Sequence, residues 1–279
     1  MKEKSASKSS SAKSASPKAV RIPKPAAASR RNAVKETSVV ELPIWASLLI
    51  FAVATVIFFR AQLFGGMHFW ASFMSDFNEL HFPKLMFAVQ HRAGGDGIPF
   101  WNPYTFGGMP YMADINTGYF YPFNLALAFT VSTAAQAVAG LELVIMLHFV
   151  VAQVAMLLLC RHLKLSSIAS IIAALSYGFS SLLVCRIIIQ TVLYDLAWFP
   201  LIVFFVHKSL TEKSWKDAIY AGLLFALILF SGHPQPTLYI GFFTGLLALW
   251  LLATGVRAGA LKGKSIAIHL ALAAVPFVV

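Results

Sequence analysis

The chain has 279 residues, of which 58% are hydrophobic and 12% are charged. Soluble domains carry roughly 25% charged residues, so this composition excludes an ordinary soluble domain and indicates an integral membrane protein. The formal net charge is +11, but ten of the 22 Lys and Arg residues lie within residues 1–40 and most of the others flank apolar segments. The positive charge therefore gives no indication of nucleic-acid binding.

Residues 1–40 consist mainly of Lys, Ser, Ala and Pro. A segment with so few large apolar side chains cannot bury enough surface to fold, so we predict a disordered basic cytoplasmic tail. Its basic residues would also be attracted to anionic lipid, by about 1 kcal/mol for each residue close to the membrane surface.

Long apolar segments follow this tail. The first, 42–59, has no small-residue cleavage pattern after it, so we interpret it as an uncleaved signal anchor with its N-terminus in the cytoplasm. The other predicted spans are 141–160, 166–185, 190–207, 215–231, 237–254 and a segment that begins near 265. We therefore predict an all-α polytopic membrane protein, in which 41–279 form a module of about seven transmembrane helices. The last segment is still apolar at Val279, so we expect this chain to be the front part of a longer protein.

The basic residues predict which loops lie outside. If the tail is cytoplasmic and the spans alternate, 18 of the 22 Lys and Arg residues lie on the cytoplasmic side. The outer ones are Arg60, Lys84, Arg92 and Arg186. This distribution follows the positive-inside rule. It makes residues 60–138 a large first outer loop, in which 122–130 is too short to span and is predicted to be a surface helix.

The two cysteines, Cys160 and Cys185, lie at opposite ends of consecutive predicted spans. About 30 Å of hydrocarbon would separate them, whereas a disulfide needs Cα atoms within about 7 Å. We therefore predict two free thiols.

Asp76 and Glu79 begin the polar part of the predicted outer loop. Their spacing fits a capping box, in which Asp76 caps a helix and Glu79 reaches back to it. The alternative is that Asp76 is a general base, which needs a carboxylate beside an acceptor hydroxyl. Spacing alone favours the capping role.

Aromatic residues and Gly/Pro turns surround Asp114 further along this loop. Tyr104, Phe106, Tyr111 and residues 119–121 could form an aromatic belt at the membrane interface. The alternative is a sugar platform, because aromatic ring faces stack on the C–H faces of a pyranose.

Polar residues also occur at the outer ends of later spans. Asp195 lies about one turn inside a span, and an ionisable residue at that depth suggests a functional role. The structural alternative is an ion pair with Arg186. His233 lies in a break between two spans, where it either belongs to a simple connecting loop or donates to a phosphate or sugar.

Several of these motifs together resemble the YfhO family of bacterial membrane proteins. The matching residues are Ser75-Asp76, Pro83, 97–103 (GIPFWNP), 107–110 (GGMP), 121–124 (YPFN), 232–235 (GHPQ) and Tyr239. The resemblance covers residue 42 to the end and is carried most specifically by the WNP and GHPQ elements. Members of this family are usually longer, so the chain resembles their front module.

The YfhO family in turn is similar to GT-C glycosyltransferases. This likeness implies a GT-C-like fold in the bacterial inner (cytoplasmic) membrane. It also implies transfer of a sugar from a polyprenyl-phosphate donor to a cell-envelope acceptor outside the cytoplasm. An acidic residue in the first outer loop is essential in that class, and Asp76 matches its position.

The implied mechanism is displacement at the anomeric carbon, with Asp76 deprotonating the acceptor hydroxyl or holding a divalent metal ion that does so. The cationic residues Arg186, Arg92, Lys84 or His233 would stabilise the leaving phosphate. The predicted substrate-binding residues are Asp114, Trp101, Asn102, Tyr111, Arg186, Asp195, His233 and Gln235.

Two other functions fit the composition. A transporter or flippase would need paired charges near the bilayer midplane and repeated halves, which the sequence lacks. A non-catalytic scaffold that binds lipid or a partner needs only the spans and the loop.

Overall fold

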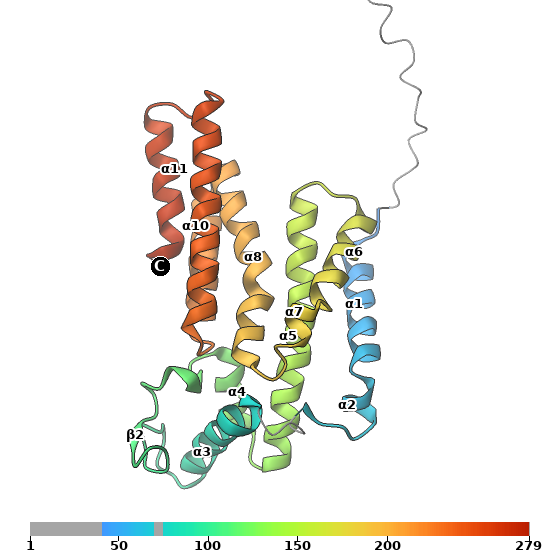
Figure 1. Ribbon diagram of the computed structural model, residues 1–279, viewed down its shortest axis with the longest axis vertical. Helices are drawn as coiled ribbons and strands as arrows, with labels where there is room; N and C mark the ends of the chain where they lie inside the picture. Colours follow the sequence, from blue (N-terminus) through green and yellow to red (C-terminus); the bar gives the residue numbers. More distant parts are fainter. Residues whose placement is uncertain (1–40, 70–74, 279) are drawn as a thin grey trace, which may run out of the picture. The chain divides into compact units, whose positions relative to one another are not determined.

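The computed structural model describes residues 41–69 and 75–278 (Figure 1). Residues 39–279 group into one compact unit, and the predicted basic tail 1–40 lies outside the described residues. The regular secondary structure of the described part is helical apart from one two-stranded antiparallel sheet, which confirms the prediction of a mostly helical protein.

The helices are bounded as follows: α1 Ile44–Phe58, α2 Arg60–Phe64, η2 Phe77–His81, α3 Phe82–Ala93, η3 Ile115–Thr117, α4 Pro122–Thr130, α5 Ala134–His162, α6 Ser167–Gly178, α7 Ser181–Val184, α8 Gln190–Glu212, α9 Trp215–Leu229, α10 Pro234–Arg257, α11 Lys264–Ala274 and η4 Val275–Phe277. The sheet pairs β1 (Trp101–Asn102) with β2 (Met109–Pro110).

Four helical segments are long and apolar enough to cross a membrane: α5, the α6–α7 stretch Ser167–Val184, α8 and α10. The helix α1 is apolar but has only 15 residues. At 1.5 Å per residue such a helix is about 22 Å long, less than the roughly 30 Å of hydrocarbon in a bilayer. All seven predicted spans are therefore helical, and four of them reach spanning length.

The ends of the long helices follow from local sequence. Thr133 and Gln136 form a capping box at the start of α5, with the Thr133 hydroxyl accepting from the Gln136 N–H at 3.3 Å. The hydroxyls of Ser166 and Ser214 cap α6 and α9 in the same way. These caps satisfy backbone donors that a membrane could not hydrate.

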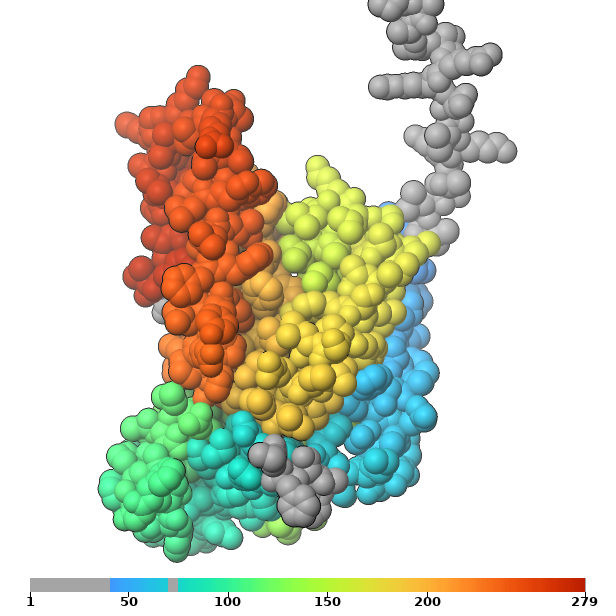
Figure 2. Space-filling model, viewed as in Figure 1, coloured from blue at the N-terminus to red at the C-terminus, as the bar shows by residue number. Residues whose placement is uncertain are grey.

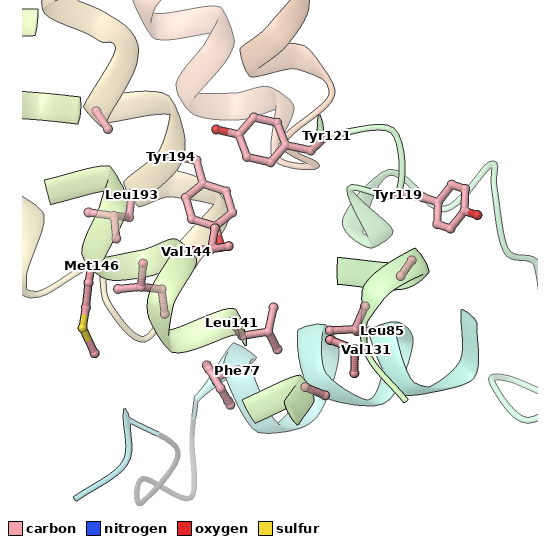
Figure 3. Packing of buried hydrophobic residues seen from close by; sticks show 14 of the residues in the cluster. Phe77, Leu85, Tyr119, Tyr121, Val131, Leu141, Val144, Met146, Leu193 and Tyr194 are labelled. Atoms are coloured by element: carbon pink, nitrogen blue, oxygen red, sulfur yellow. The ribbon is translucent and has the colours of Figure 1, made fainter. Parts of the chain in front are cut away.

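The core lies between α5 and α8. The helix α5 packs against α6 and α8, and α8 also packs against α9 and α10. Leu141, Val144, Leu193 and Tyr194 from these two helices belong to one buried cluster (Figure 3). Residues from the segment before α5, including Phe77, are buried in the same cluster. The predicted outer loop is therefore packed onto the helices, because it contributes to their core.

Contacts place three connecting segments at the same end of the helices. The N–H of Asp76 donates to the carbonyl of Ile188, between α7 and α8, at 3.1 Å. Gly118 lies against Ser231, between α9 and α10. We call this end, formed by residues 60–69, 75–133, 185–189 and 230–233, the loop end (Figures 1 and 2).

Polar contacts at the opposite end join the start of α1 to α5 and α6. Arg161 donates to the Glu41 carboxylate at 2.7 Å, and Ser167 donates to the same carboxylate at 2.7 Å. His162 and His207 contact each other at 2.9 Å beside them in α5 and α8. The helices α5, α6, α8, α9 and α10 thus alternate in direction along the chain (Figure 1).

Candidate functional site at the loop end

Asp76 lies at the start of η2 with a partly exposed side chain. Its carboxylate makes no capping hydrogen bond. The hydroxyl of Ser75 instead accepts from the N–H of Phe77 at 3.2 Å. The capping-box alternative is therefore wrong. Among the described residues the Asp76 carboxylate has no hydrogen-bond or ion-pair partner, so it is available to bind a ligand.

Asp114 forms an ion pair with Lys84 of α3, with 2.6 Å between Lys84 Nζ and Asp114 Oδ2. Each of the two side chains is 11% exposed. The other carboxylate oxygen of Asp114 accepts from the N–H of Asn116 at 3.0 Å, which caps η3. Both oxygens are thus engaged, and Asp114 joins α3 to the segment that follows β2.

Asp195 of α8 is fully buried, and its carboxylate binds residues at the connection between α9 and α10. Its oxygens accept from the hydroxyl of Ser231 at 2.6 Å and from that of Thr237 at 2.9 Å. Arg186 is exposed in the segment before α8 and forms no ion pair with a described residue. The alternative that Asp195 pairs with Arg186 is therefore wrong.

Two glycines allow the segment before α4 to pack closely against the connection between α9 and α10. Gly118 has φ +52°, and a Cβ there would lie 2.5 Å from the carbonyl oxygen of Ser231. Gly232 has φ +106°, and a Cβ there would lie 2.6 Å from the carbonyl oxygen of Ile115. Only glycine combines this backbone geometry with so close an approach. We call this contact between 115–118 and 231–232 the glycine interlock.

His81 lies near His233, which directly follows Gly232 of this interlock. Burial of His81, with the nearby charges of Lys84 and His233, lowers the pKa of its imidazole to about 3. His81 is therefore neutral near pH 7, whereas His233 is partly exposed at the N-cap of α10. We call His81, Lys84, Asp114 and His233 the loop-end cluster. It contains three residues for which the sequence predicts a role, namely Lys84, Asp114 and His233.

The aromatic residues of this segment separate into exposed and buried groups. Tyr104 and Phe106 are 86% and 93% exposed, and Trp101 is 55% exposed in β1. Tyr111 is buried and donates to the carbonyl of Lys84 at 2.8 Å, and burial raises the pKa of its phenol. Tyr121 is also buried, so residues 111–121 do not form one continuous exposed platform.

Asn102 and Gln235 use their side chains within the fold. Asn102 is buried, where it accepts from the N–H of Tyr104 at 3.0 Å and donates to Thr105 at 3.0 Å. Gln235 is exposed on α10 and donates to the hydroxyl of Tyr239 at 2.7 Å. Asn102 thus stabilises the turn after β1, while Gln235 remains accessible.

A buried polar chain joins the loop to the helices; a hydrogen-bonded contact of His148 within the helix bundle is expected from the sequence, whereas the roles of Trp198 and Tyr121 were missed. Trp198 of α8 donates to the hydroxyl of Tyr121 at 2.8 Å, and that hydroxyl contacts His148 of α5. His148 also donates to the carbonyl of Val144 at 2.6 Å, so its Nε2 accepts from Tyr121. The ring of Tyr121 stacks on Tyr194 with 5.1 Å between centroids (Figure 3). Polar residues inside predicted spans were the signal for this network.

No described contact joins Asp76 to the loop-end cluster. Asp76 contacts the segment between α7 and α8, whereas Asp114 and His233 lie at the break between α9 and α10. The described residues contain no group of three or more His, Cys, Asp and Glu side chains placed to hold a metal ion. Both cysteines are free, as predicted.

An apolar groove of about 880 Å³ begins beside the loop-end cluster. It is lined by α9, α10 and residues 276–278, with glycines 222, 241 and 245 in its wall. The groove extends from Pro234 to Leu249 along α10. That length is about 22 Å at 1.5 Å per residue. Thr237, which hydrogen-bonds Asp195, also lines it.

The fold combines four helical segments long and apolar enough to cross a membrane with an apolar groove that begins near the loop end. Comparisons with protein-family models, curated proteins and solved structures give no match. The likeness to the YfhO family therefore rests on the sequence motifs alone.

Proposed function

We propose that this protein transfers a sugar from a polyprenyl-phosphate donor to a cell-envelope acceptor at the loop end, as its likeness to YfhO and GT-C proteins implies. The supporting observation is the apolar groove along α9 and α10, which runs from Leu249, in a helix long enough to span a membrane, to Pro234, the residue after His233. A long apolar chain matches the length and the apolar lining of this groove, and its phosphate head would lie at the Pro234 end, next to His233.

In the proposed reaction Asp76 accepts the proton of the acceptor hydroxyl as that oxygen attacks the anomeric carbon. The bond from this carbon to the phosphate oxygen breaks, and the lipid phosphate leaves with the electron pair. Arg186 is exposed and free of ion pairs with described residues, so it is the cation best able to bind the phosphate. Lys84 and Arg92 are engaged with Asp114 and the carbonyl of Val131.

A non-catalytic lipid-binding scaffold is the second candidate. The carboxylates of Asp114 and Asp195 are both fully engaged in hydrogen bonds that hold the loop and the break before α10. A protein in which only Asp76 remains available among these acids could bind a lipid without changing it. The two candidates share the groove and differ in the role of Asp76.

Filling the groove tests what both candidates share. In Gly241→Leu and Gly245→Leu an added Cβ would meet its first neighbour at 3.8 and 3.9 Å, so both variants should fold. We expect them to lower affinity for polyprenyl phosphate at least tenfold, measured by binding in nanodiscs. The control Trp250→Leu changes an exposed α10 residue outside the groove and should bind as the wild type does. Equal affinity in all variants would contradict the proposal that the groove binds the lipid chain.

A further inference from the structure

A second, enclosed cavity lies between α3, α4 and the segment before α4. Its volume is about 20 Å³. The polar residues around it are His81, Tyr111, Thr117, Tyr119 and Asn124, and the remaining lining side chains are apolar. It is much too small for a sugar or a lipid chain and is separate from the groove along α10.

Two buried polar atoms of residues that line this cavity lack partners. His81 is 7% exposed, and its Nε2 has no hydrogen-bond partner among the described residues. The same holds for Oδ1 of Asn124. The other amide atom, Asn124 Nδ2, donates to the carbonyl of Gly118 at 3.0 Å, which fixes the orientation of the side chain. Buried polar atoms in folded proteins are nearly always paired with protein or with ordered water.

We propose that this cavity binds one water molecule, which bridges Nε2 of His81 and Oδ1 of Asn124. A water needs at least about 10–15 Å³ of such volume and two to four polar partners. The cavity meets both conditions and has room for a single molecule. The water donates to Asn124 Oδ1, since an amide oxygen only accepts, and forms a second hydrogen bond with the imidazole nitrogen.

Hydroxyl groups around the cavity provide a further partner. The Thr117 hydroxyl donates to the carbonyl of Asp114 at 2.8 Å, so its oxygen can still accept a hydrogen bond from the water. The Tyr111 hydroxyl already donates to Lys84. A water with these contacts has the two to four hydrogen bonds that buried waters typically make.

The water would join elements that the loop-end cluster depends on. His81 lies immediately before α3, which carries Lys84, while Asn124 lies in α4 and holds Gly118 of the glycine interlock. A single bridging molecule therefore links both sides of the cluster. This inference is independent of sugar transfer, because it concerns how the loop is held together.

A structure of the full chain at a resolution that shows ordered water tests the proposal. We expect one peak within about 3.2 Å of both His81 Nε2 and Asn124 Oδ1. The variant His81→Phe should lose this peak. The control variant His91→Phe, in the following helix α3 and outside the cavity, should keep it. A wild-type cavity without a peak, or with a peak that contacts only one of the two atoms, overturns the proposal.

An unfolding experiment provides a second readout. Removing one partner leaves the other buried with fewer hydrogen bonds. Each single substitution is therefore expected to raise the equilibrium constant for unfolding by roughly fivefold or more. The double variant His81→Phe/Asn124→Leu should cost less than the two single variants combined, because no orphaned atom remains. Additive effects of the two substitutions would contradict a bridging water.

Discussion

At the level of single residues, His81 shows how burial sets the protonation of a side chain at the loop end. Its imidazole is enclosed and lies near the positive charges of Lys84 and His233, so the pKa falls from 6.5 to about 3. A neutral His81 can make hydrogen bonds with either ring nitrogen but adds no charge to the cluster. The positive charge that a phosphate would meet there therefore comes from other side chains.

The lowered pKa of His81 predicts a pH-dependent stability. The unfolded chain takes up a proton near pH 6.5 and the folded chain only near pH 3, so stability should fall as the pH drops from 6.5 towards 3. The loss should reach a few kcal/mol, since one pKa unit corresponds to about 1.4 kcal/mol. Unfolding in detergent measured from pH 7 to pH 4 checks this, with His81→Phe expected to show a shallower dependence. An equal slope in both proteins would contradict it.

Asp195 provides a second prediction at this scale. Asp195→Ala removes the acceptor of both the Ser231 and Thr237 hydroxyls and should destabilise the fold by about 2–5 kcal/mol. Arg186→Gln should change stability by less than about 0.5 kcal/mol, because the guanidinium is exposed and unpaired among the described residues. Thermal unfolding of the two variants distinguishes this arrangement from an Asp195–Arg186 pair, which predicts that both variants lose stability.

Whether the sequence alone predicts the role of a residue depends on how far along the chain its contact partners lie. The apolar segments and free cysteines were predictable, because both follow from local composition and spacing. The partners of Asp195 were not, since they depend on how α8 faces the break before α10, 36 and 42 residues further along the chain. Spacing alone favours Asp76 as the cap of η2, whereas the hydroxyl of its neighbour Ser75 accepts the hydrogen bond there, because helix boundaries are least certain at the level of one residue.

At the element scale, the glycine interlock joins the loop to the α9–α10 connection. The sequence marks both partners, GHPQ at 232–235 and the residues after Asp114, but it does not show that they meet. Backbone-to-backbone contact leaves no space for a side chain at Gly118 or Gly232. Asp114 and His233 are therefore held near each other by close backbone packing of their neighbours, and not by an ion pair between them.

Substituting a glycine of the interlock should separate steric effects from backbone effects. Gly118→Ala and Gly232→Ala each place a Cβ about 2.5 Å from a carbonyl oxygen, in addition to strain at positive φ. We expect each to cost about 2–4 kcal/mol. The control Gly95→Ala, at φ +85° with no atom within 4 Å, should cost only about 1 kcal/mol. Equal costs in unfolding measurements would mean that the close approach contributes little.

At the scale of the whole molecule, the described helices and the loop end form one continuous packed unit. Tyr121, at the start of α4, is stacked on Tyr194 of α8 and hydrogen-bonded to Trp198, so the loop is anchored inside the helical core. The sequence suggested that these aromatics form an exposed belt or platform. The periodicity of apolar residues and the composition could not show that Tyr121 is buried while Tyr104 is exposed. That difference arises only when the loop packs on the helices.

The proposed function assigns sugar transfer to the loop end, with Asp76 as the general base. It is tested most directly by a transfer assay in membranes, with a polyprenyl-phosphate sugar as donor, on wild type, Asp76→Asn and Asp96→Asn. Asp96→Asn changes an exposed carboxylate of a nearby turn and serves as the matched control. We predict that Asp76→Asn reduces transfer by at least 100-fold, in line with the usual contribution of a general base, while Asp96→Asn retains full activity. Undiminished transfer by Asp76→Asn would contradict the claim.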